Sequence, residues 1–336
     1  MKNERLKAVL KFLFFLLLGV FLIWVTTKSL SSQEIEEVKK QLLNANFKIL
    51  IPSIIIILFS HFIRALRWQM LIKPLSYQPG IINVFLSVLI GFFFNLVFPR
   101  LGELMKCTLL GKHEKIPVDK LVGTMVAERF VDVFCLVIVI VITIFSQYQR
   151  VGIYAKEIWS KFYTGIFNDL NRTIIGFLIV ALIVSVLVIA YKKFEQSTLG
   201  VKVRLILSGI LLGIVSIRKI EKKSLFILYT FLIWFFYLYC IKIGFLAINE
   251  LSDLGWTPSL TILTFGSFAM IATQGGIGAY QLAVQKTLVL YEIKEVTGLA
   301  FGWLMWSVQT IFLMITGPLS ILVMSIINKQ RKTSLS

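Results

Sequence analysis

The sequence predicts an all-α polytopic membrane protein with about six full spans and two broken or re-entrant helical hairpins of opposite orientation. Hydrophobic residues make up 57% of the chain and its mean hydropathy is +0.86. A soluble protein of this size has no interior large enough to bury so much apolar surface. Long apolar runs recur along the chain, so we expect about eight membrane segments in a single integral membrane domain, residues 1–336.

Six apolar runs are long enough to cross a bilayer. They cover residues 8–27, 49–72, 121–146, 173–191, 224–249 and 297–327. The first run has no small-residue cleavage site, which favours a retained helix over a removed signal peptide. The run 203–217 is too short to span and has basic residues on both sides, so we predict a cytoplasmic basic segment, 192–223, that contains a short surface helix.

The distribution of basic residues predicts the orientation. Four of the first eleven residues are Lys or Arg, which places the N-terminus in the cytoplasm. Six crossings return the basic C-terminal segment to the same side, so we expect a multi-pass protein of the bacterial cytoplasmic (inner) membrane with both termini cytoplasmic. The net charge of +18 then reflects this bias and contact with anionic lipid, and we expect no nucleic acid partner.

The two remaining apolar stretches, 81–111 and 258–290, are each interrupted by a polar motif that contains glycine. The first lies between Lys73 and Lys120, so both of its ends are predicted to be cytoplasmic. The second lies between Asp253 and Glu292, so both of its ends are predicted to be external. Each stretch must enter the membrane and return, as a re-entrant hairpin or as two short helices. This layout is compatible with an inverted repeat around a transport site near the midplane.

The first interruption reads NLVFPRLGELMK, residues 95–106. Pro99 removes a backbone donor and Gly102 permits a tight turn. Arg100 offers a planar fork for a phosphate or carboxylate, and Glu103 could hold that arginine or meet a cationic headgroup. The alternative is an ordinary cytoplasmic loop in which Arg100 and Glu103 pair in solvent.

A charged triplet lies inside the predicted span 121–146, in the sequence AERFVD. Glu128 and Asp132 are four residues apart and share a helical face with Arg129 near them. Charges at this depth usually face a partner or a wet cavity, although a structural ion pair between helices is the alternative. The triplet is net negative, so we expect another cation beside it, which Arg100 or Arg64 could supply.

The sequence HFIRALRW, residues 61–68, contains two further basic residues near the cytoplasmic end of a span. We interpret Arg64 and Arg67 mainly as side chains that reach towards the lipid headgroups. His61 could carry a proton, but a hydrogen-bonded helix residue is the simpler interpretation.

The second interruption reads ATQGGIGAYQ, residues 272–281. Gly275, Gly276 and Gly278 would expose backbone N–H groups, and a helix that begins near Ala279 would direct its positive end at the break. This geometry can hold an anion, whereas close helix packing through glycine is the alternative. No strand precedes the glycines, so the motif is not a nucleotide fingerprint.

Cofactor chemistry finds no support in the sequence. Cys107, Cys135 and Cys240 are far apart, and His61 and His113 are the only histidines. No metal-ligand spacing, disulfide framework, Walker motif or serine-nucleophile motif appears. We therefore expect no metal and no cofactor.

Taken together, the motifs resemble the bacterial lysylphosphatidylglycerol synthase/flippase membrane-domain family over essentially the whole chain. The shared order is N-x-x-x-P-x-R-x-G-E, then E-R-x-x-D, then a basic surface segment, then G-G-x-G. The residues that carry it are Asn95, Pro99, Arg100, Gly102, Glu103, Glu128, Arg129, Asp132, Gly276 and Gly278. Lys106 replaces the family's usual Arg. Gln274 and Gln281 stand where the family usually has a proline and a nearby Glu, which weakens the expectation of a cationic headgroup.

The resemblance implies a flippase-like lipid translocase that moves a phospholipid, anionic or aminoacylated, between leaflets. In full-length family members a soluble lysyltransferase domain follows the membrane region, and we expect none after the last helix here. We therefore expect lipid movement and no enzymatic aminoacyl transfer. Two alternatives stay open. The first is a lipid-modifying membrane enzyme with Glu128 or Asp132 as general base. The second is a membrane partner of a separate lipid or envelope synthase.

Overall fold

Helices make up every regular element in the part of the chain that the computed structural model describes. That part comprises residues 17, 19–24, 27–28, 30–97, 101–147, 160 and 219–333. Four of its helices are long and apolar enough to cross a membrane. They are α3 (Phe47–Ile72), α6 (Val118–Ser146), α10 (Lys223–Phe245) and α13 (Glu295–Thr333). The all-α polytopic membrane architecture is thereby confirmed.

These four helices match the predicted spans 49–72, 121–146, 224–249 and 297–327, with differences at two ends: α13 continues to Thr333, and α10 ends earlier than predicted. Helix α10 ends at Phe245, because the chain then turns through Leu246 into the short 3-10 helix η4 (Asn249–Leu251). The predicted span 8–27 is described only in part, and its described residues are helical. The predicted span 173–191 and the basic segment 192–223, apart from residues 219–223, lie outside the described residues.

The first interrupted stretch forms two antiparallel helices, α4 (Ile81–Val97) and α5 (Leu101–Glu114). At the open end of this hairpin, the Asn83 amide donates to Glu114 Oε1 over 2.5 Å. Near its tip, the Gly102 backbone N–H donates to Asn95 Oδ1 over 2.9 Å. Pro99 and Arg100 fall between the two helices and lie outside the described residues.

The second interrupted stretch also forms a hairpin. It consists of α11 (Trp256–Ala272), the 3-10 helix η5 (Gln274–Gly276) and α12 (Ala279–Val289). The Thr261 and Tyr291 hydroxyls lie 2.7 Å apart and join its open end. At its tip, Gly275 and Gly276 have φ values of 58° and 75°, a left-handed conformation that glycine adopts without the Cβ penalty.

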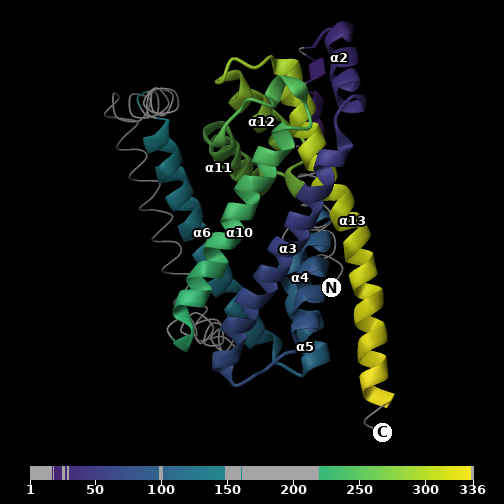
Figure 1. The fold of residues 1–336 in the computed structure, drawn as a ribbon. Helices are drawn as coiled ribbons and strands as arrows, with labels where there is room; N and C mark the ends of the chain where they lie inside the picture. Colours follow the sequence, from purple (N-terminus) through teal and green to yellow (C-terminus); the bar gives the residue numbers. More distant parts are fainter. Residues whose placement is uncertain are drawn as a thin grey trace, which may run out of the picture.

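The two hairpins point in opposite directions, because their open ends meet opposite ends of α13 (Figure 1). At the first hairpin, Asn83 is paired with Asn328 near the C-terminal end of α13. At the second, Lys286 Nζ lies 2.7 Å from the carboxylate of Glu295, the first residue of α13. The tips meet where Gly275 packs against Leu96. The predicted opposite orientation is confirmed, whereas the inverted repeat stays a prediction.

Apolar packing surrounds the meeting point of the hairpins. One buried cluster, which contains Trp68 and Leu110, holds the first hairpin against α3 and α6. Another, which contains Phe245 and Phe301, holds the second hairpin against α10 and α13. The short helix α2 (Ser32–Leu43) precedes α3 and begins with a capping box, in which hydrogen bonds from Ser31 lower the pKa of the exposed Glu34 carboxyl.

Candidate functional site

A buried ionic cluster joins α3 to α6 on the inner side of the first hairpin. Arg64 Nη1 lies 2.8 Å from Glu128 Oε1 and 2.8 Å from Asp132 Oδ2. Arg67 Nη2 lies 2.6 Å from Asp132 Oδ1 and 3.4 Å from Glu128 Oε1. Because Glu128 and Asp132 are one turn apart on α6, one helical face presents both carboxylates to both arginines.

Helix α5 adds a third cation to this cluster. Lys106 Nζ lies 2.7 Å from Glu128 Oε2 and 4.3 Å from the centre of the Trp68 ring. Lys106 reaches this depth because α5 packs tightly on α4, where a methyl group on Gly102 would overlap the carbonyl oxygen of Gly91. All four carboxylate oxygens of Glu128 and Asp132 are therefore engaged by Arg64, Arg67 or Lys106.

The interpretation of Arg64 and Arg67 as headgroup-seeking side chains is wrong. Their exposed fractions are only 4% and 0%. Helix α10 contributes further hydrogen bonds to both arginines. The Tyr237 hydroxyl accepts one from Arg64 over 3.0 Å, and the Thr230 hydroxyl accepts one from Arg67 over 3.4 Å. Arg64 supplies the expected extra cation, and Arg67 supplies one that the sequence reasoning did not place in the site. The sequence signal that could have identified this pairing is the spacing of Arg64 and Arg67, three residues apart, which matches two carboxylates one helical turn apart.

Arg129 differs from the other three cations. Its guanidinium nitrogens lie 3.7 Å from Glu128 Oε1 and 3.6 Å from Asp132 Oδ2, too far for hydrogen bonds. Its side chain is 38% exposed, and its buried Nε has no hydrogen-bond partner among the described residues. Arg129 is thus a cation whose hydrogen-bond donors are still available.

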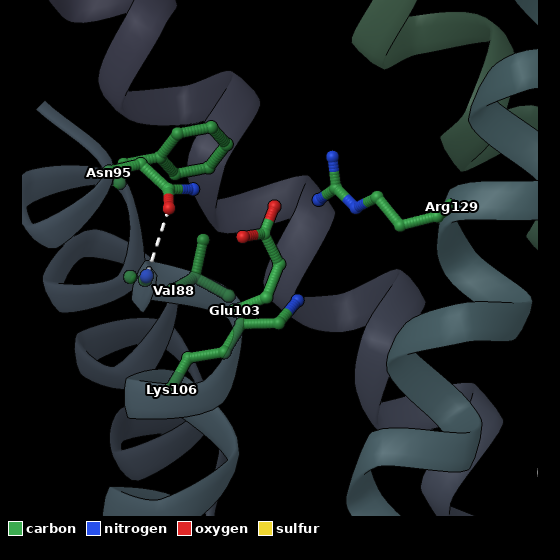
Figure 2. A pocket seen from close by; sticks show the side chains of 8 residues that line it. Val88, Asn95, Glu103, Lys106 and Arg129 are labelled. Carbon is green, nitrogen blue, oxygen red and sulfur yellow. Dashed lines mark hydrogen bonds between the residues drawn. The ribbon is translucent and has the colours of Figure 1, made fainter. Parts of the chain in front are cut away.

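Glu103 faces Arg129 from the first turn of α5. Figure 2 shows its carboxylate between α5 and α6, with the Arg129 guanidinium approaching from the opposite side. The two groups form no ion pair within 4.0 Å, and Glu103 Oε2 is buried without a hydrogen-bond partner in the described part of the chain. Among the described residues, the site therefore contains one donor group, the Arg129 guanidinium, and one acceptor, Glu103 Oε2, that make no hydrogen bond.

Arg129 and Glu103 open into a cavity of about 520 Å³ between the hairpin tips. Both tips contribute to its lining, through Asn95 and Leu96 from the first and Gly275 from the second. The Trp306 indole on α13 donates to the carbonyl of Gly275 over 2.8 Å and fixes this edge. The full lining comprises Arg64, Phe92, Asn95, Leu96, Glu103, Arg129, Asp132, Val133, Leu136, Trp234, Tyr237, Ser267, Met270, Ile271, Thr273, Gly275, Trp306, Gln309, Thr310 and Leu313.

The cavity is amphipathic. Charged groups gather at the side of the first hairpin, and apolar side chains such as Leu136, Met270 and Leu313 form much of the remaining wall. Val133 and Ile271, which also line it, are 60% and 67% exposed on the outer surface of the helices. A cavity of this kind can hold a charged group while apolar chains extend outwards.

Comparison with known proteins identifies the family. The model of the family described as lysylphosphatidylglycerol synthase TM region matches residues 9–317. The chain belongs to this family. A relative in it is the UPF0104 membrane protein MJ1595 of Methanocaldococcus jannaschii, 34% identical over 101 residues. That match covers 29% of this chain and 30% of the relative. No solved structure matches the chain.

The residues that carry the family resemblance are only partly brought together. Asn95, Glu103, Arg129 and Asp132 line the cavity, and Glu128 lies directly behind it. Gln281 is fully buried on α12 with no partner for its amide among the described residues, and it does not line the cavity. This departure from the lysylphosphatidylglycerol synthase pattern thus lies outside the lining of the cavity that Arg129 faces.

The glycine motif of the family surrounds the tip of the second hairpin. A side chain at Gly276 would meet Met270, and one at Gly278 would meet the backbone of Gly19. These contacts favour close helix packing for this motif. The side chain of Gln274 lies outside the described residues.

His61 lies behind the cavity wall. It is 2% exposed and stacks near Phe92 and Phe312, with ring centroids 4.5 and 6.0 Å away. Neither ring nitrogen has a hydrogen-bond partner among the described residues, which contradicts the simple hydrogen-bonded role. In the same part of the chain, no group of three or more His, Cys, Asp or Glu side chains could hold a metal.

Proposed function

We propose that this member of the lysylphosphatidylglycerol synthase transmembrane family is a flippase-like translocase that carries a phospholipid headgroup through the cavity between the hairpin tips. The observation that carries the proposal is Arg129: among the four clustered cations, its guanidinium alone makes no hydrogen bond to the described residues and faces an amphipathic cavity. A planar guanidinium with free donors suits the oxygens of a phosphate.

The surrounding ions act as the scaffold for Arg129. Arg64, Arg67 and Lys106 saturate Glu128 and Asp132, so these carboxylates hold Arg129 only through long contacts. A bound phosphate can therefore compete for Arg129 without dismantling the cluster. The same ion pairs speak against Glu128 or Asp132 as a general base, because each carboxylate oxygen is already held by a cation and is a poor acceptor for a substrate proton.

The hairpins provide the path. Broken helices that enter from opposite ends and meet at a site are the arrangement that secondary transporters use near the bilayer midplane. The exposed flanks at Val133 and Ile271 let acyl chains stay in lipid while the headgroup passes. We place the protein in the bacterial cytoplasmic membrane with both termini cytoplasmic, where a separate synthase could supply a modified lipid. Movement is passive or driven by an ion gradient.

A leaflet-exchange assay tests the proposal. Purified protein is reconstituted into liposomes that carry headgroup-labelled phospholipids, and wild type is compared with Arg129→Gln and with Lys39→Gln. Lys39 is a suitable control because it is an exposed cation on α2, 63% accessible, whose ion pair among the described residues is with its neighbour Glu36. We expect wild type and Lys39→Gln to exchange at least one lipid and Arg129→Gln to lose most of that activity at equal folded protein. Exchange of no lipid by wild type, or full exchange by Arg129→Gln, contradicts the proposal.

A further inference from the structure

We infer that the cavity selects a phosphate headgroup of net charge −1 that carries hydroxyl groups, of the phosphoglycerol type, and disfavours headgroups that carry an ammonium. This inference rests on the proposed function and specifies the substrate of the same site. It depends on the charge of the cluster and on the unused hydrogen-bonding groups of Arg129 and Glu103.

The Lys, Arg, Asp and Glu residues of the described site do not cancel one another. Four cations, Arg64, Arg67, Lys106 and Arg129, face three carboxylates, Glu103, Glu128 and Asp132, which leaves a net charge of +1. Uncompensated charge in a buried membrane site is costly. A headgroup of charge −1 cancels this excess. A zwitterionic headgroup leaves it unchanged, and a cationic aminoacyl headgroup increases it.

Glu103 adds a second requirement. An ionised carboxylate only accepts hydrogen bonds, and its buried Oε2 receives none from the described residues. A ligand that places its phosphate on Arg129 must therefore offer a donor towards Glu103. Both a hydroxyl and an ammonium can donate, but only the hydroxyl does so without adding positive charge. Charge and hydrogen bonding together favour a hydroxyl-bearing monoanion.

The first test is a binding competition with wild-type protein in detergent, read out by native mass spectrometry. The competing lipids have identical acyl chains and differ only in the headgroup: phosphatidylglycerol, phosphatidylmethanol, phosphatidylethanolamine and lysyl-phosphatidylglycerol. Phosphatidylmethanol keeps the charge of −1 but has no hydroxyl. We expect phosphatidylglycerol to be retained on the order of tenfold over the two ammonium lipids, and severalfold over phosphatidylmethanol.

Two variants assign these preferences to residues. Glu103→Gln should remove the preference for phosphatidylglycerol over phosphatidylmethanol while anionic lipids stay favoured. Arg129→Gln should reduce the preference for anionic lipids. Glu36→Gln is the matched control, because Glu36 is a 75% exposed carboxylate on α2 that does not line the cavity. If a variant does not fold, the wild-type competition alone decides.

The outcomes separate this inference from the proposed function. If ammonium lipids bind as tightly as phosphatidylglycerol, the charge selection is wrong. If phosphatidylmethanol equals phosphatidylglycerol, the role of hydroxyl groups is wrong. In both cases lipid binding stands. If no lipid is retained, the proposed function itself fails. Soluble glycerol phosphate is the last competitor: displacement at the same concentration as the lipid would support the headgroup chemistry and overturn a lipid as its source.

Discussion

Lys106 on α5 and Glu128 on α6 form a buried ion pair, in which Nζ lies 2.7 Å from Oε2. Their side chains are only 5% and 0% exposed. The other oxygen of Glu128 accepts from Arg64 on α3, so this one carboxylate joins the first hairpin to two long helices. Glu128 therefore both balances the charge of the buried cations and holds α3, α5 and α6 together.

Glu128→Gln is expected to lower the free energy of unfolding by about 3–5 kcal/mol, because it leaves Arg64 and Lys106 buried with one carboxylate fewer. Denaturant or thermal unfolding of the detergent-solubilised protein measures this change. Glu36→Gln, which removes an exposed carboxylate, should leave stability unchanged within about 0.5 kcal/mol. Equal stability of the two variants would show that the cluster contributes little to the fold.

Gly102→Ala is expected to destabilise the protein by about 1–3 kcal/mol, because the added methyl group overlaps the carbonyl oxygen of Gly91 and forces α4 and α5 apart. Gly255→Ala is the matched control, since no atom lies within 4 Å of a methyl group there and its φ of −86° suits alanine. The measurement is the shift of the melting temperature. A Gly102→Ala protein as stable as Gly255→Ala would mean that the hairpin tolerates separation.

Much of the fold could be predicted from the sequence, because length and hydropathy determine membrane helices. Helices α3, α6, α10 and α13 begin and end within a few residues of the predicted spans, apart from the longer C-terminal end of α13 and the earlier end of α10. The two hairpins follow from the polar interruptions together with the charges on their flanks. What hydropathy cannot supply is the contact between Leu96 and Gly275, since apolar runs do not specify which tips meet.

The site was harder to predict than the fold. The triplet Glu128, Arg129 and Asp132 can be recognised from the sequence, because charges inside a membrane span are rare. Arg67, by contrast, sits where a snorkelling arginine is also expected, and only its contact with Asp132 distinguishes the two roles. The sequence cannot distinguish Arg129 from Arg64, since the difference depends on which guanidinium lies within hydrogen-bond distance of the carboxylates.

The orientation of the protein can be tested with single cysteines at the open ends of the hairpins. Lys73 and Asp253 are both exposed, and the charge distribution predicts a cytoplasmic Lys73 and an external Asp253. In intact cells, a membrane-impermeant maleimide should label Asp253→Cys and should label Lys73→Cys only after permeabilisation. Each variant carries Cys135→Ser, because Cys135 is the one native cysteine that is not buried. The reverse labelling pattern would invert the topology and the side on which the first hairpin opens.

A cross-link between the hairpin tips tests whether the tips part during transport. A methyl group on Gly275 would lie 3.7 Å from the Cα of Leu96, so cysteines at these two positions are within disulfide range. The left-handed φ of Gly275 makes its substitution cost about 1–2 kcal/mol, which a protein of this size should tolerate. With Cys135→Ser in the background, mild oxidation of Leu96→Cys/Gly275→Cys should produce the linked peptide in mass spectrometry. Leu96→Cys/Asp253→Cys should not, because α11 separates Asp253 from the tip by about 25 Å.

Lipid exchange by the same linked protein then separates two mechanisms. If a headgroup must pass between the tips, oxidation should stop exchange and a reducing agent should restore it. Leu96 and Gly275 touch each other and both line the cavity, so a covalent link between them would hold this part of the cavity wall closed. Full exchange by the oxidised protein would instead show that lipids move past the tips along the exposed flank of Val133 and Ile271, with the hairpins acting as a rigid frame for Arg129.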